Sequence, residues 1–250
     1  MALDKKRHRS HRIKVADLSH SVGKHTCPAL IGEFPQLAAE YPIVFVKSEQ
    51  GGEQGGELRS VAMLGVKPGR NLFWQNNRWQ GAYIPSALRA HPFAMVAIEG
   101  QEGQFAICID ESSPSMAGDR ERGESLFDKN GEQTEYLSNI SNFLLELRMQ
   151  TSLSNEFARY LDEKGLLEEQ VVLVKLPGGM DHRLTGVFRV NERAVNRLPD
   201  QEFLALRKRG YLSAIYAHLG SLRQVNNLSR LYGQLSQTEG YANASGGGRG

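Results

Sequence analysis

The sequence predicts an α+β fold, with a mainly antiparallel sheet from the N-terminal half and helices mostly in the C-terminal half. Strand-like segments between residues 43 and 110 are joined by glycine- and proline-containing turns. These turns are shorter than the crossovers, of roughly a dozen residues, that parallel pairing needs. From residue 134 onward apolar residues recur at helical spacing, interrupted by a second predicted hairpin at residues 171–190.

The N-terminal half contains short strand-like segments separated by turn residues. Pro42 ends a short helical segment, and glycine pairs between residues 50 and 56 predict a long connection between two strands. Asn76 and Asn77 predict a tight turn. In chain order, the predicted elements are an extended segment at 13–18, a helix at 33–41, strands at 43–47, 58–66, 71–75 and 78–84, a helical turn at 85–92, and strands at 93–98 and 104–110.

The C-terminal half carries the helical periodicity. Apolar residues recur at positions 137, 140, 144 and 147 and then at 153, 157, 160 and 161, which predicts one amphipathic helix over residues 134–163. Gly165 is its predicted C-terminal cap. Turn and cap residues then delimit a hairpin at 171–176 and 182–190 over Pro177-Gly178-Gly179, helices after the N-caps Asn191 and Asp200, and a last helix after Gly210.

Basic charge is concentrated near the N-terminus. Six basic side chains and one acidic side chain lie within residues 1–14, so the rest of the chain is slightly acidic. We interpret residues 1–12 as a flexible basic arm, residues 13–232 as a single domain and residues 233–250 as a disordered tail. Residues 111–125 lack an apolar period and mark an internal loop or boundary. The arm predicts weak, salt-dependent attraction to phosphates at most, and no sequence-specific nucleic-acid binding.

The composition is that of a globular protein, with 250 residues, 40% of them hydrophobic and 23% charged. Cys27 and Cys108 are the only cysteines, which excludes a disulfide scaffold and a cysteine-rich zinc site. We expect Cys27 to be an unreactive, partly buried thiol and Cys108 to lie in the core. The net charge of +2 does not indicate a nucleic-acid-binding protein. With short apolar runs and no visible secretory signal, we expect no membrane insertion and a cytoplasmic location.

Recognisable catalytic and metal-binding motifs are missing from the sequence. Its glycines match no phosphate-binding pattern, and its seven histidines form no local zinc motif. Four early histidines and one carboxylate lie near one another in sequence, but a flexible terminus preorganises ligands poorly. We therefore predict no metal and no cofactor, and expect the four histidines of this early cluster to be solvated. The residues concerned are His8, His11, His20, His25 and Glu33.

The segment between residues 71 and 91 has the densest recognition chemistry in the chain. Tryptophan, tyrosine and arginine combine large contact area with polar groups, as at protein-binding hot spots and sugar-stacking sites. Because alternate strand residues face the core, core packing is the alternative for Phe73, Trp79 and Tyr83. The candidate binding residues, with a protein as the expected partner, are Trp74, Arg78, Trp79, Tyr83, Arg89 and His91.

Several stretches taken together resemble the bacterial SapC-like family. They occur in the family's order from residue 10 to about residue 231, so the resemblance covers nearly the whole chain. The stretches are Ser10-His11-Arg12-Ile13-Lys14-Val15, residues 28–34, 39–45, 64–65, 71–73, 78–79 and 83–85, Leu88-Arg89-Ala90-His91-Pro92-Phe93, residues 108–110, 126–128 and 131–132, Thr185-Gly186-Val187-Phe188-Arg189-Val190, and residues 216–219 and 221–222.

The resemblance implies little about biochemical activity. The family's name links it to bacterial surface layers and serum resistance. Its members are also often encoded near outer-membrane receptors, tryptophan-halogenase-like proteins and cupin-like oxygenases. The family supplies no agreed set of catalytic residues. A surface role for this chain implies a dedicated secretion route, because we find no cleavable signal.

Two functions remain open from the sequence. The first is a non-catalytic accessory or protein-interaction module. The alternative is an enzyme whose site is assembled from distant residues, acting alongside halogenase-like or cupin-like oxygenases and outer-membrane receptors. A deep pocket holding two or more of the polar candidates favours the enzyme, whereas a shallow apolar patch favours the binding module. The polar candidates are Tyr83, Arg89, His91, Asp110 and His218.

Overall fold

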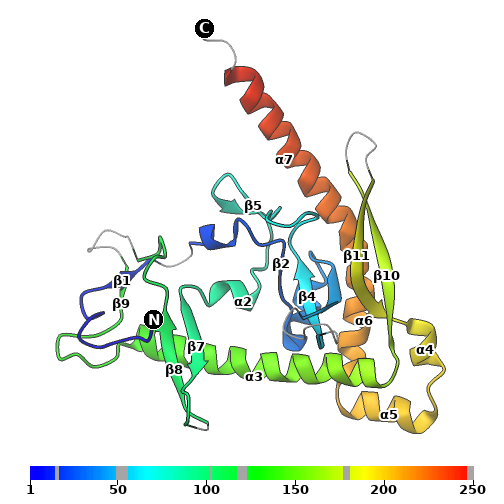
Figure 1. Cartoon of the computed structure of the whole chain (residues 1–250), viewed down its shortest axis with the longest axis horizontal. Helices are drawn as coiled ribbons and strands as arrows, with labels where there is room; N and C mark the ends of the chain where they lie inside the picture. The colour runs from blue at the N-terminus through cyan, green and yellow to red at the C-terminus, as the bar shows by residue number, and fades with distance from the viewer. Residues whose placement is uncertain (15–16, 49–55, 102, 117–122, 177–180, 247–250) are drawn as a thin grey trace. The chain divides into compact units, whose positions relative to one another are not determined.

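The computed structural model describes the chain except for residues 15–16, 49–55, 102, 117–122, 177–180 and 247–250 (Figure 1). The described chain divides into two compact units. The first unit comprises residues 1–21 and 86–150, and the second unit comprises residues 22–85 and 151–250. The loop expected at residues 111–125 belongs to the first unit, and its residues 117–122 lie outside the described residues.

The first unit is built on one β-hairpin and the first part of a long helix, α3 (Glu135–Glu163). The strands β7 (Phe93–Ala97) and β8 (Phe105–Ile109) pair antiparallel, as the sequence predicts. The unit also contains β1 (Arg12–Ile13), its antiparallel partner β9 (Glu124–Ser125), the 3-10 turn η1 (Ser19–Ser21) and α2 (Ser86–Arg89). Its buried core includes Ile13, Phe93, Ile109, Leu126, Leu137 and Leu144.

The first residues of the chain lie along β8. The amino group of Met1 donates to the Ile109 carbonyl at 3.0 Å, and the Leu3 amide donates to the Ile107 carbonyl at 2.8 Å. These hydrogen bonds satisfy backbone groups at an otherwise open strand edge. The sequence predicts a flexible arm over residues 1–12 from its charges. Those charges give no sign of the pairing with β8, because the pairing depends on residues more than a hundred positions away.

The second unit contains a five-stranded antiparallel sheet. Its strands, in spatial order, are β10 (Leu167–Lys175), β11 (Asp181–Val190), β3 (Ile43–Lys47), β4 (Leu58–Met63) and β2 (Thr26–Pro28). The β10–β11 hairpin confirms the predicted strand pair, and it joins β3 through the pairing of Phe188 with Phe45. The connection predicted at residues 50–56 and the turn at 177–179 fall largely outside the described residues.

The strand pairing confirms the predicted antiparallel, α+β architecture but distributes the strands differently. The strands between residues 43 and 110 belong to three separate sheets rather than one. The second unit's large sheet takes β3 and β4, a small hairpin is formed by β5 (Trp74–Gln75) and β6 (Arg78–Trp79), and β7–β8 stays in the first unit. Turn residues fix which neighbours form hairpins, whereas burial of distant apolar side chains decides which hairpins join.

The helices of the second unit follow most of the predicted caps. The side chain of Asn191 accepts the Ala194 amide at 3.0 Å, which confirms the predicted N-cap. Asp200 is the first helical residue rather than the cap, which is Pro199. The elements are η2 (Ile31–Glu33), α1 (Phe34–Leu37), α4 (Glu192–Asn196), α5 (Asp200–Lys208), α6 (Tyr211–Ser221), η4 (Leu222–Gln224) and α7 (Val225–Gly246).

The chain ends in the helix α7, coloured orange to red in Figure 1. This helix continues through most of residues 233–250, for which the sequence predicts disorder, and residues 247–250 lie outside the described residues. Among the described helices, none combines the length and apolar character needed to cross a bilayer.

The helix α3 confirms the longest prediction from periodicity. Gly165 follows it with φ 63°, the left-handed conformation of a C-terminal cap. In the second unit, Phe157 of α3 is fully buried, and its ring lies 5.9 Å from the Phe34 ring and 4.9 Å from the Tyr211 ring. Leu153, predicted to share this buried stripe, is instead 43% exposed.

Candidate functional site

The β5–β6 hairpin positions the two tryptophans of the candidate binding segment. Asn76 and Asn77 have φ values of 52° and 56°, as a type I′ turn requires, so the predicted turn is confirmed. The hairpin places Trp74 directly opposite Trp79, and directly opposite residues share one face of an antiparallel ribbon. The two indole side chains therefore lie on the same face.

The indole nitrogen of Trp79 is part of a partly buried hydrogen-bond network. Its Nε1 donates to the Tyr83 carbonyl at 3.1 Å and to the Tyr41 hydroxyl at 3.2 Å, and its ring stacks on Phe73 at 5.8 Å. The Tyr41 hydroxyl also donates to the Tyr83 carbonyl, and burial raises the pKa of Tyr41. These contacts fix the indole of Trp79, which stays partly exposed.

Tyr83 is held by a second contact of the same region. Its hydroxyl donates to the carboxylate of Glu33, which is buried, and its own side chain is half-buried. Nearby, both carboxylate oxygens of Glu40 accept the Ala82 amide, at 2.7 and 2.9 Å. The chain between Trp79 and Tyr83 is therefore positioned by two carboxylates, one of them buried.

Trp74 and Arg78 are the other two candidate residues on this hairpin. Arg78 is exposed beside the exposed turn, and Trp74 is half-buried. Gln75, opposite Arg78, is buried and donates to the Leu72 carbonyl at 2.7 Å. The hairpin is thus anchored through Trp79 and Gln75, while Arg78 is exposed and Trp74, like Trp79, keeps part of its surface open to solvent.

The other two candidate binding residues, Arg89 and His91, lie in the first unit. The guanidinium of Arg89 is exposed, donates to the Ser86 hydroxyl at 2.5 Å and lies 5.4 Å from the centre of the Phe143 ring. His91 is half-buried and stacks on His20, with ring centres 4.0 Å apart. The six candidates are therefore divided between two units, with four of them on or beside one hairpin.

His91 also contacts a serine, at a distance typical of a base and a nucleophile. Its Nε2 lies 2.8 Å from the hydroxyl of Ser113. Ser113 is only 3% exposed, and its hydroxyl also accepts the Ser115 amide at 3.2 Å. Because Ser113 is buried and also bonded to the Ser115 amide, we interpret it as a structural residue that stabilises the turn after β8 rather than as a nucleophile.

The polar residues considered for an enzyme are also divided between the units. Tyr83 and His218 belong to the second unit, and Arg89, His91 and Asp110 belong to the first. Asp110 is exposed and accepts the Ser112 hydroxyl at 2.6 Å, and this hydrogen bond lowers the pKa of its carboxyl. Three clefts, of about 850 Å³ in the first unit and about 460 and 290 Å³ in the second, are lined by none of the five residues.

His218 is buried between two strands of the large sheet. Its Nε2 accepts the Val190 amide at 3.0 Å, which leaves the proton on Nδ1 to be donated to the Ile43 carbonyl at 2.9 Å. Burial lowers the pKa of His218 to about 4. The imidazole is therefore neutral at pH 7 and joins β11 to β3.

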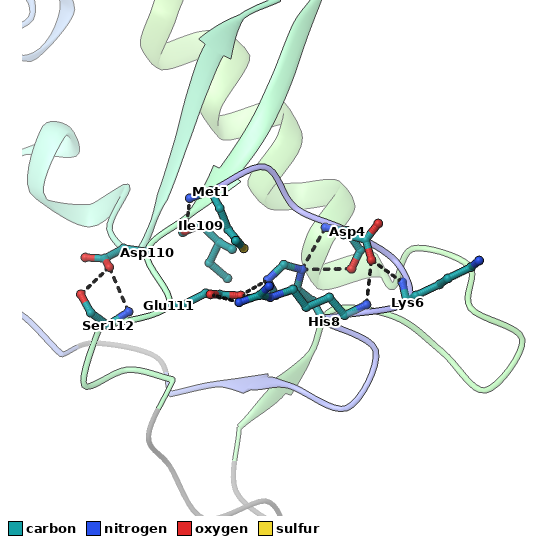
Figure 2. Close-up of polar contacts among 9 residues, drawn as sticks. Met1, Asp4, Lys6, His8, Ile109, Asp110, Glu111 and Ser112 are labelled. Atoms are coloured by element: carbon teal, nitrogen blue, oxygen red, sulfur yellow. Dashed lines mark hydrogen bonds and ion pairs between the residues drawn. The ribbon is translucent and has the colours of Figure 1, made fainter.

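A polar network of the first unit involves residues that the sequence does not single out together (Figure 2). His8 is fully buried; its Nδ1 lies 2.9 Å from the Asp4 amide nitrogen and its Nε2 lies 2.9 Å from Glu111 Oε1. Arg7 donates to both oxygens of Glu111, at 2.6 and 2.7 Å, and lowers the pKa of that carboxyl. The expectation of a solvated histidine is wrong for His8, because its partner lies 103 positions away in sequence.

The two cysteines differ in burial. Cys27 is buried, and burial raises the pKa of its thiol, which agrees with an unreactive side chain. Cys108, expected in the core, is only partly buried. Within the described part of the chain, no group of three or more histidine, cysteine, aspartate or glutamate residues is arranged to hold a metal ion.

Comparison with known proteins identifies the family. A family model described as SapC matches residues 3–228, which include both units almost completely. No curated protein and no solved structure matches the chain. The family match agrees with the resemblance that the ordered sequence stretches indicate. The chain belongs to the SapC family.

Proposed function

We propose that the chain is a non-catalytic accessory protein that binds another protein through the β5–β6 hairpin. The observation that carries the proposal is that Trp74 and Arg78 lie on a hairpin whose paired residues, Trp79 and Gln75, are held by hydrogen bonds. Tryptophan and arginine are enriched at the centres of protein interfaces. A fixed hairpin loses little conformational entropy on binding, which favours affinity.

The positions of the polar residues support binding rather than catalysis. His218 uses both ring nitrogens to connect strands, and Tyr83 is bound to the buried Glu33. A catalytic site needs polar groups that converge on a space open to substrate. The three clefts described above contain none of the five residues considered for that role.

The proposal is tested by locating the partner on the hairpin. We would place a photo-crosslinking amino acid at position 74 in the full chain, expressed in its native host, and identify crosslinked proteins by mass spectrometry. Because the family name links SapC proteins to bacterial surface layers, the envelope fraction is analysed beside the soluble fraction. The matched control carries the same amino acid at position 173, an exposed apolar position on β10 in the same unit.

Single substitutions then test whether the contact contributes to binding. Trp74→Ala and Arg78→Ala should weaken capture of the crosslinked partner by about tenfold, as loss of an interface hot spot does. Leu173→Ala and Arg183→Ala, at exposed positions of the β10–β11 hairpin, should leave capture unchanged. Equal losses in all four variants, or the same crosslinked proteins at positions 74 and 173, would contradict the proposal. A small molecule that co-purifies with the chain and is converted by it would favour the enzyme instead.

A further inference from the structure

One cleft of the first unit lies between the N-terminal segment and the loop before α3. It has a volume of about 850 Å³, within the range of small-molecule sites. Its walls come from residues 6–12 on one side and from residues 125–134 on the other. The lining residues are Lys6, Arg9, Ser10, His11, Arg12, Ser125, Phe127, Asp128, Lys129 and Thr134.

The charges that line this cleft are strongly unbalanced. Among the lining residues that the structure describes, four side chains are permanently basic and Asp128 is the one carboxylate. Asp128 Oδ1 accepts the amides of Asn130 and Glu132, both at 2.8 Å, so this carboxylate shapes its own loop. A net positive charge confined to a concave surface concentrates anions there. The excess is local, because the whole chain carries a net charge of only +2.

The basic residues of the N-terminal segment fall into two groups. Lys5 pairs with Glu132 at 3.4 Å and Arg7 pairs with Glu111 at 2.6 Å, so both have carboxylate partners. In the described part of the chain, the four basic side chains that line the cleft have no carboxylate within ion-pair distance. These are Lys6, Arg9 and Arg12 from the N-terminal segment and Lys129 from the facing loop.

The two arginines are oriented without being neutralised. Arg12 Nη1 donates to the Gly123 carbonyl at 2.9 Å, and Arg9 Nη2 donates to the Lys129 carbonyl. Each guanidinium has five N–H donors, so a single backbone contact leaves most of them for a ligand. Planar guanidinium groups bind phosphate oxygens in pairs, and the nearby lysines supply additional point charges.

We propose that this cleft binds a small molecule that carries at least two phosphate groups. Four basic side chains carry more positive charge than one phosphate balances, and they come from both walls of the cleft, which favours a ligand with more than one phosphate group. The N-terminal wall is a fixed surface rather than a loose tail, because the Met1 amino group, the Leu3 amide and the buried His8 are all bonded to β8 or to the loop after it. A fixed, concave wall favours a compact ligand over an extended nucleic acid.

The test uses the full chain and calorimetric titration with inorganic phosphate, pyrophosphate and ADP. We expect pyrophosphate and ADP to bind more tightly than phosphate. Lys6→Gln and Lys129→Gln, at exposed positions, should each weaken pyrophosphate binding by about tenfold or more, the loss expected for one charge-assisted hydrogen bond. Lys5→Gln is the matched control, because this neighbour of Lys6 pairs with Glu132 outside the cleft and should leave the affinity unchanged. Thermal melts of each variant establish that it is folded.

Four results would overturn the proposal. The first is a lack of binding to all three phosphate probes. The second is a loss of affinity in Lys5→Gln as large as that in Lys6→Gln, which would indicate general surface charge. The third is binding to vesicles containing phosphatidic acid without binding to the free phosphates, which would indicate a lipid surface. The fourth is tight binding of a DNA or RNA oligonucleotide at physiological salt that Lys6→Gln abolishes, because the cleft would then be a nucleic-acid surface.

Discussion

Replacing the buried His218 with leucine should strongly destabilise the second unit. The imidazole accepts the Val190 amide at 3.0 Å and donates to the Ile43 carbonyl at 2.9 Å, and its side chain is fully buried. Leucine fills a similar volume but satisfies neither backbone group. A buried unsatisfied donor or acceptor costs about 1–3 kcal/mol, so we expect His218→Leu to lower the free energy of unfolding by about 2–6 kcal/mol at pH 7.

The same histidine should make stability depend on pH. Burial lowers the folded-state pKa of His218 to about 4 from an ordinary value of 6.5. Between these values the unfolded chain binds a proton that the folded chain does not, so the free energy of unfolding rises with pH. The contribution is complete above about pH 6.5 and is lost progressively as the pH falls toward 4. The gap between the two pKa values corresponds to about 3 kcal/mol.

Urea unfolding of the wild-type chain and of His218→Leu measures both effects. The only two tryptophans, Trp74 and Trp79, belong to the second unit, so indole fluorescence reports on the unit that contains His218. The difference in unfolding free energy between the two proteins should be large at about pH 7.5 and should narrow by about 2 kcal/mol or more near pH 4.5. Tyr216→Leu, at an exposed position of the same helix, is the control and should show neither effect. A difference that stays constant between the two pH values would refute the reasoning.

Three further substitutions test the packing of each unit. Gly81→Ala places a Cβ 2.7 Å from the Tyr41 hydroxyl, so urea unfolding should show a loss of about 1–3 kcal/mol, and unchanged stability would argue against this close approach. Phe157→Ala empties a fully buried position and should cost about 3–5 kcal/mol in the same assay; a loss below about 1 kcal/mol would mean that the ring is not central to the core. Glu111→Ala removes the carboxylate partner of the buried His8, so hydrogen exchange should accelerate at the amides of residues 1–8, and unchanged exchange would contradict the assigned contact.

Local chemistry accounts for the elements that the sequence predicts well. The helix α3 follows from an apolar period maintained over many residues and from Gly165, whose conformation disfavours a side chain. The turn at Asn76 and Asn77 follows from the tolerance of asparagine for positive φ. Each of these signals acts between residues that are near in sequence, so it can be read without knowledge of distant contacts.

The arrangement of strands into sheets depends on contacts between distant segments. The pairing of Phe188 with Phe45 joins hairpins that lie in opposite halves of the chain, and the sequence contains no local signal for that choice. The exposed Leu153 shows the same limit, because periodicity predicts a buried stripe but not which of its members a neighbouring element covers.

The sequence by itself determined most of the helices, the turn at Asn76 and Asn77, the antiparallel hairpins and the family, because each depends on neighbouring residues or on an ordered set of short stretches. It predicted disorder where α7 continues to Gly246. It also identified the hairpin that carries Trp74 and Arg78. Only the tertiary structure decided which of the N-terminal charges are paired, because Glu111 and Glu132 pair with Arg7 and Lys5 while Lys6 lies beside an open cleft. A basic run has the same composition whether its charges are paired or free, and only the fold brings distant carboxylates to some of them and not to others.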